Sequence, residues 1–176
     1  TGIGLSTLVD AYLFPVPQSV LEAFSEVLLP DEIPLWQLVF FICVMPGILE
    51  ELAFRGVLLH GLRKTWSPVI VCLVTGGIFG LFHVELFRLI PTAYLGVIFA
   101  AVVLLTGSIF PAMLWHFGNN AIALVPHRMG WVTEETVFPE WVFAIAFVAL
   151  LVVFWIIWKV STPYPDLKKK RPDAFG

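Results

Sequence analysis

The sequence predicts an all-α fold, a polytopic transmembrane helix bundle of about five spanning helices with an N-terminal interfacial amphipathic helix. Of 176 residues, 59% are hydrophobic and 13% are charged, and the mean hydropathy is +0.93. Soluble domains carry about 25% charged residues, and a soluble fold of this length could not bury so much apolar surface. Ten Lys and Arg against thirteen Asp and Glu exclude a basic nucleic-acid binder, and two cysteines exclude a disulfide scaffold.

Residues 1–35 are predicted to be a partial or interfacial N-terminal segment. The apolar stretch 2–14 is too short to span a bilayer. It is interpreted as the remainder of an earlier helix. Either the chain is the C-terminal piece of a longer protein with additional N-terminal membrane helices, or the protein is a compact one. Ser19 and Glu22 have the spacing of a capping box, and apolar residues mark one face of the segment that follows. An amphipathic helix over 20–29 is therefore expected at the membrane surface.

Five later stretches are long and apolar enough, or nearly so, to cross a bilayer core of about 30 Å. They cover residues 36–59, 68–88, 91–106, 108–126 and 139–158. Ser67 precedes Pro68, which predicts a capped helix start with a proline in the first turn. Pro91 and Pro139 are expected at first helical positions in the same way, and Ser108 is expected to cap the fourth span.

The basic residues indicate the orientation of the bundle. If the spans alternate in direction, one side of the membrane receives Arg63, Lys64, Lys159, Lys168, Lys169, Lys170 and Arg171. Cytoplasmic loops carry the excess of Lys and Arg in membrane proteins, so we expect this side, with the C-terminus, to be cytoplasmic. The predicted division is a membrane domain over 36–160 and a basic cytoplasmic tail over 161–176.

Three ionisable residues lie well inside the first span, where charges are costly and therefore informative. Glu51 and Arg55 are four residues apart, the spacing at which an acid and a base meet on one helix face. Glu50 is rotated by about 100° from Glu51 and lacks a local partner. The pair predicts a salt bridge that fixes helix packing. Glu50 is either a general base or a protonated acid that hydrogen-bonds a neighbouring helix.

Two more helices supply polar partners at similar depth. His83 lies in the second span, and His116 and Asn120 share a face of the fourth span at the i,i+4 spacing. A single histidine in an apolar helix is more often a satisfied core residue than a catalyst. Two histidines, an amide and an unpaired glutamate on separate helices favour a shared polar cavity. Asn119 is rotated by about 100° from Asn120 and is interpreted as a solvating or interhelical amide.

These residues form three motifs in a fixed order on successive hydrophobic segments. They read Glu-Glu-x-x-x-Arg at 50–55, Phe-x-x-x-His at 79–83 and His-x-x-x-Asn at 116–120. Together they resemble the motifs of the CAAX prenyl endopeptidase type II family, also called CAAX protease and bacteriocin-processing intramembrane proteases. The resemblance covers about 36–126, and three ordered motifs make it specific.

The resemblance implies an intramembrane endopeptidase with assigned catalytic roles. Glu50 and His83 would activate a water for attack on a peptide carbonyl. His116 and Asn120 would stabilise the oxyanion of the tetrahedral intermediate, and a carboxylate, imidazoles and an amide are suited to these tasks. Structural support of the first helix would come from Glu51 and Arg55.

A metal-dependent version of the same protease is the alternative mechanism. A catalytic zinc needs three protein ligands and a water, and Glu50, His83 and His116 could supply such a set. The sequence has no His-Glu-x-x-His helix, and its cysteines lack metal-ligand spacing. The metal-free mechanism also gives Asn120 a role. No cofactor is therefore favoured, with zinc as the alternative.

Two functions of other classes stay open from the sequence. One is a non-catalytic membrane module that serves self-immunity, transport or assembly, and the other is a proton-coupled transporter that uses Glu50 and the histidines as a relay. The expected partners are the lipid bilayer and a membrane protein or peptide substrate, and no nucleic acid. No residue pattern in the sequence predicts the recognition of a prenyl group. We expect an integral protein of a bacterial plasma membrane.

Overall fold

The computed structural model describes residues 32–83 and 86–131, together with residues 19–20, 30, 139, 141, 144–145, 148, 151–153, 155–156 and 159. Every element assigned within these ranges is a helix, which confirms the all-α prediction for them. The predicted N-terminal segment and the basic tail lie almost wholly outside the described residues. Half of the predicted fifth span, 139–158, also lies outside them.

The first helix is continuous over Leu35–Leu62 but changes its winding along the way. It comprises, in order, α3 (Leu35–Leu38), the π-helix η1 (Val39–Val44), α4 (Met45–Glu51), the π-helix η2 (Leu52–Leu59) and α5 (His60–Leu62). Pro46 lies at the start of α4. A proline has no N–H, so Pro46 donates no backbone hydrogen bond to the preceding turn. Glu50 and Glu51 are the last two residues of α4, which lies between the π-helices η1 and η2.

The second predicted span is shorter than expected. Helix α6 covers Pro68–Phe82, and the Ser67 hydroxyl accepts a hydrogen bond from Ile70 N at 3.4 Å, so the predicted cap is confirmed. The predicted end at residue 88 is wrong. At His83 the backbone N–H bonds the carbonyl of Gly80 at 3.2 Å, a tight turn that closes the helix.

The next two helices correct three further boundaries. Helix α7 covers Leu86–Thr106, so it begins before Pro91, which lies inside the helix and not at its first position. Helix α8 covers Phe110–Arg128, two residues later than predicted at both ends. The Ser108 hydroxyl accepts from Phe110 N at 3.4 Å, although the residue at the cap position is Ile109. Gly107, with φ of +67°, makes the turn between α7 and α8.

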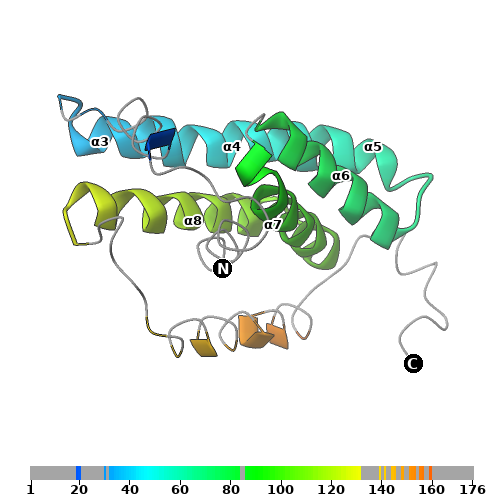
Figure 1. Cartoon of the computed structure of the whole chain (residues 1–176). Coiled ribbons are helices and arrows are strands. Elements are labelled where there is room, and N and C mark those ends of the chain that lie inside the picture. Colours follow the sequence, from blue (N-terminus) through cyan, green and yellow to red (C-terminus); the bar gives the residue numbers. More distant parts are fainter. Residues whose placement is uncertain are drawn as a thin grey trace.

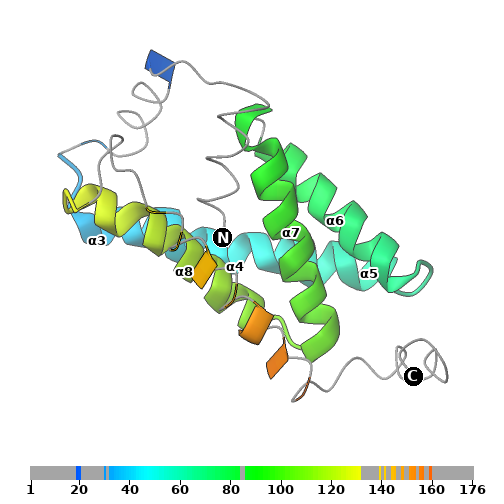
Figure 2. The same cartoon turned by 60° about the horizontal axis from the view of Figure 1, so that its bottom comes forward.

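Helices α6 and α7 lie side by side, and α8 runs along the half of the first helix that holds α4 (Figures 1 and 2). Glycine makes the α6–α7 approach close. A Cβ atom added at Gly76 would lie 2.7 Å from the backbone nitrogen of Val97, and one added at Gly96 would lie 2.8 Å from the Cα atom of Gly76. Buried apolar side chains of α6, α7, α8 and η2 form the main core around Phe99.

Two described helices are long and apolar enough to cross a membrane, by length and composition: Leu35–Leu62 and Arg88–Thr106 within α7. Helix α6 has 15 residues and is about 22 Å long, which is short of a bilayer core. Helix α8 has the length but carries His116, Asn119 and Asn120 at its centre. The five-span prediction is therefore not confirmed. In α8 the predicted site residues His116 and Asn120 also lower the hydropathy of the helix.

Candidate active site

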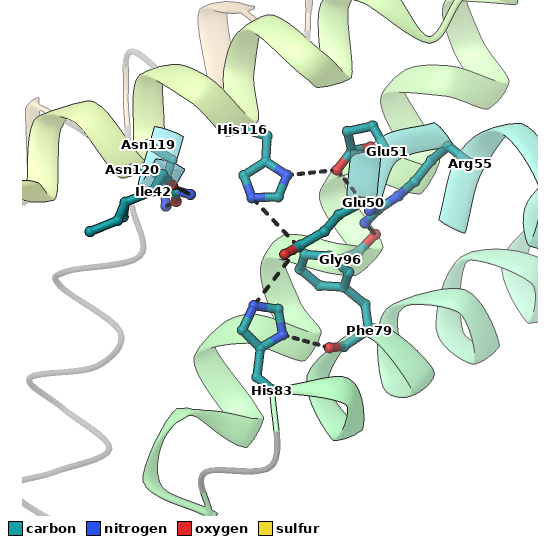
Figure 3. Close-up of polar contacts among 10 residues, drawn as sticks. All are labelled: Ile42, Glu50, Glu51, Arg55, Phe79, His83, Gly96, His116, Asn119 and Asn120. Carbon is teal, nitrogen blue, oxygen red and sulfur yellow. Dashed lines mark hydrogen bonds and ion pairs between the residues drawn. The ribbon is translucent and has the colours of Figure 1, made fainter. Parts of the chain in front are cut away.

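Three predicted site residues meet around one carboxylate oxygen. Glu50 Oε2 lies 4.0 Å from His83 Nε2 and 3.9 Å from His116 Nε2 (Figure 3). Glu50 belongs to α4 and His116 to α8, and His83 is the C-cap residue of α6. The Glu50 oxygen is buried and has no hydrogen-bond partner. The side chains of Glu50 and His83 are 22% and 19% exposed, so the cluster is accessible from one side.

Both imidazoles are held by their Nδ1 atoms. His83 Nδ1 lies 2.9 Å from the carbonyl oxygen of Phe79, and His116 Nδ1 lies 2.9 Å from Glu51 Oε1. Carbonyl and carboxylate oxygens only accept hydrogen bonds, so we assign the proton to Nδ1 in both rings. In both rings Nε2 is the nitrogen that faces Glu50, and it is unprotonated whenever the ring carries a single proton.

Glu51 and Arg55 form the predicted ion pair, and both side chains are fully buried. Arg55 Nη1 donates to Glu51 Oε1 at 2.8 Å, while Arg55 Nη2 donates to the carbonyl oxygen of Gly96 at 2.9 Å. Glu51 Oε1 is the same oxygen that accepts from His116. The pair therefore belongs to a hydrogen-bond network that reaches α7 through Gly96 and α8 through His116. The prediction gave the pair a role within the first helix alone.

Aromatic rings enclose this network. The guanidinium carbon of Arg55 lies 4.5 Å from the centre of the Phe79 ring and 5.3 Å from that of Phe99, within the range of cation–π attraction. The His116 ring stacks on Phe99 at 5.3 Å with an interplanar angle of 24°. Sequence reasoning missed Phe99, because one phenylalanine among 16 in an apolar chain carries no distinguishing signal.

Asn120 is placed away from the Glu50 cluster. Its Nδ2 atom donates to the carbonyl oxygen of Ile42 at 2.9 Å, and Asn119 Nδ2 donates to its Oδ1 at 3.5 Å (Figure 3). Asn120 thus bonds a backbone carbonyl of the first helix, in η1, across the interface with α8.

A zinc ion does not fit these side chains as they are placed. Zinc ligands lie about 2.0–2.1 Å from the metal, so tetrahedral neighbours are about 3.3–3.4 Å apart. The two separations from Glu50 Oε2 are 3.9 and 4.0 Å. Within the described part of the chain, no group of three or more His, Cys, Asp or Glu side chains is arranged to hold a metal. No step below runs through a metal, and the metal-free site stays a prediction.

Comparison with known protein families places this cluster in context. The family model described as type II CAAX prenyl endopeptidase Rce1-like matches residues 32–122, just over half of the chain. Comparisons with curated proteins and with solved structures give no match. The matched region contains Glu50, His83 and His116, with the whole of α4 and α6 and most of α8. The chain therefore belongs to the Rce1-like family of type II CAAX prenyl endopeptidases.

Proposed function

We propose that this protein is an intramembrane endopeptidase that hydrolyses a peptide bond in a membrane-associated protein or peptide. The family is one of peptidases, which supplies the class of reaction. One observation carries the assignment of residues: Glu50 Oε2 is buried without a hydrogen-bond partner, and two imidazole nitrogens face it. A buried carboxylate oxygen needs a donor. A water molecule would supply one.

In this proposal, the reacting water lies between Glu50 and His83. An oxygen about 2.8 Å from both acceptors closes a triangle whose long side is the 4.0 Å separation between them. Its two hydrogens then point at Glu50 Oε2 and His83 Nε2. Glu50 takes one proton while the water oxygen bonds the peptide carbonyl carbon, and it later gives that proton to the leaving amide nitrogen.

His116 and Asn120 are proposed to stabilise the oxyanion. Since His116 Nδ1 donates to Glu51, Nε2 can donate to the oxyanion only when the ring carries both protons. The oxyanion itself then balances the charge of the ring, because the charge of Glu51 is already paired with Arg55. An amide nitrogen has two hydrogens, and Ile42 takes one from Asn120. We assign the other to the oxyanion. A donor of this kind contributes about 3–4 kcal/mol.

The test is the substitution Glu50→Gln in the full-length protein, expressed in cells that lack their own copy. Gln keeps the size of the side chain but cannot take a proton from water. We expect peptide termini present with the wild-type protein to disappear with Glu50→Gln. Glu32→Gln, an exposed carboxylate in the turn before α3, is the matched control. Identical sets of termini in all three strains would leave the peptidase proposal without support.

The same strains distinguish the other functions. A non-catalytic membrane module would keep its effect in Glu50→Gln, and a proton-coupled transporter would give flux in sealed vesicles without cleavage products. Treating the purified active protein with a chelator tests the zinc alternative, since a metal-free site keeps its activity. We further propose a bacterial plasma membrane location with a cytoplasmic C-terminus, which protease accessibility of a C-terminal tag in inverted vesicles would check.

A further inference from the structure

We propose that Glu51 is a positioning residue for His116, separately from its ion pair with Arg55. Its carboxylate fixes the proton of His116 on Nδ1 and aims Nε2 at Glu50 and the reacting atoms. The inference rests on the proposed peptidase function for its kinetic consequence. Its structural content, the tautomer and orientation of one ring, can be measured independently of activity.

The two nitrogens of the His116 ring have different surroundings: Nδ1 is hydrogen-bonded to Glu51, and Nε2 faces Glu50. Nδ1 lies 2.9 Å from Glu51 Oε1, and Nε2 lies 3.9 Å from Glu50 Oε2. Phe99 stacks on one face of the ring, and the Phe79 ring meets it edge-on at 5.8 Å. The rings restrict the plane of the imidazole, but they do not distinguish its two nitrogens. Of the two carboxylates that face the ring nitrogens, Glu51 lies within hydrogen-bond distance at 2.9 Å and Glu50, at 3.9 Å, does not, so the geometry favours the proton on Nδ1.

Glu51 is itself held rigidly enough to do this. It is fully buried, and Arg55 donates to the same oxygen, Oε1, at 2.8 Å. Arg55 is anchored in turn by its second bond, to Gly96 O on α7. The acceptor for His116 therefore has a fixed position set by two helices. Supporting contacts of this type orient the reacting imidazole in other enzymes, where their loss costs about 10²–10⁴ in rate.

The competing interpretation is that Glu51 only neutralises Arg55. The two interpretations predict different behaviour when both charges are removed together. Replacing a buried ion pair with apolar residues of similar volume is often neutral for stability. In the double variant Glu51→Leu with Arg55→Met, neutralisation is no longer needed, so a purely structural pair predicts normal function. A positioning role predicts a folded protein in which His116 has lost its orientation.

The experiment is ¹⁵N NMR of the histidine rings in detergent micelles, with activity measured in parallel on a substrate found in the Glu50→Gln comparison. The chain has four histidines, and the His116 signals are identified by their absence in His116→Gln. We expect wild-type His116 to carry its proton on Nδ1 and the double variant to lose that preference. His83, whose Nδ1 is held by the Phe79 carbonyl, is the internal control and keeps its tautomer in both proteins.

Activity gives the second measurement. We expect kcat of the folded double variant to fall by at least about 100-fold, with KM changed much less. Retention of the Nδ1 proton by His116 in that variant, or wild-type kcat, would overturn the proposal. If the double variant does not fold, the wild-type spectrum still decides, because a proton on Nε2 alone refutes the assignment. If the wild-type protein cleaves nothing, the peptidase proposal fails while the NMR result stands.

Discussion

Adding one methyl group at Gly76 should weaken the pairing of α6 with α7, whereas the same change at Gly77 should not. A Cβ atom at Gly76 would lie 2.7 Å from the backbone nitrogen of Val97 and 2.8 Å from the carbonyl oxygen of Ala93. These are backbone atoms, which cannot turn aside as a flexible side chain can. A Cβ atom at Gly77 meets nothing within 4 Å. The two neighbouring residues therefore differ only in what they face.

The pair of variants isolates the packing contribution. Gly→Ala in a helix gains about 0.8–1.0 kcal/mol from backbone propensity, and this gain is shared by both positions. Overpacking costs about 1–3 kcal/mol and applies to Gly76→Ala alone. We therefore expect Gly76→Ala to be about 1–3 kcal/mol less stable than Gly77→Ala.

Unfolding in mixed micelles with increasing SDS, followed by far-UV circular dichroism, measures the difference between the two variants. Gly77→Ala should unfold at the same SDS fraction as the wild-type protein or at a higher one, and Gly76→Ala at a lower one. Equal midpoints for the two variants would refute the close α6–α7 crossing. The same midpoint for Gly76→Ala and wild type would limit the overpacking cost to the propensity gain.

Three other changes test contacts of the first helix and of the start of α6, all by the same SDS titration. Asn120→Ala should cost about 0.5–1.5 kcal/mol, because the carbonyl of Ile42 loses the hydrogen bond from the amide. Arg55→Lys should cost about 1–3 kcal/mol, since an ammonium group cannot reproduce the two divergent bonds of the guanidinium. Ser67→Ala should cost about 0.5 kcal/mol, at the low end for caps, because the bond is long and exposed.

Each expectation has a contradicting result. An unchanged unfolding midpoint for Asn120→Ala would mean that the bond to Ile42 contributes nothing to stability. Wild-type stability of Arg55→Lys would mean that one of the two guanidinium bonds contributes nothing. A large loss in Ser67→Ala would indicate a contact beyond the cap.

The parts of the site that depend on local spacing were predictable. Glu51 and Arg55 meet because residues four apart on a helix always do, and the pairing is confirmed at 2.8 Å. The approach of His83 and His116 to Glu50 followed from their similar depth on successive segments. The bond from His116 to Glu51 was not predictable, because it depends on how far α8 is rotated and shifted against the first helix. No periodicity within one helix contains that information.

The missed features of the fold have similar causes. Between Phe82 and Leu86 the chain carries no Gly or Pro, so its hydropathy hides the end of α6. Many glycines of the sequence are suited to helix contacts, but only the crossing of α6 and α7 distinguishes Gly76 from Gly77. The bond from Asn120 to the Ile42 carbonyl was not predictable either, because it depends on how α8 lies against the first helix.

The Glu51–Arg55 pair also has a consequence for how the protein is made. Both residues belong to one turn of the first helix, so their ion pair can form as soon as that helix exists. A single charge at the centre of a helix costs about 2.5–3.5 kcal/mol on insertion into the bilayer, and a pair that neutralises itself lowers this cost. The partners that hold the pair in the finished protein, Gly96 and His116, are synthesised later. The first helix can therefore enter the membrane with Glu51 and Arg55 already neutralising each other, and the same two groups later receive α7 and α8.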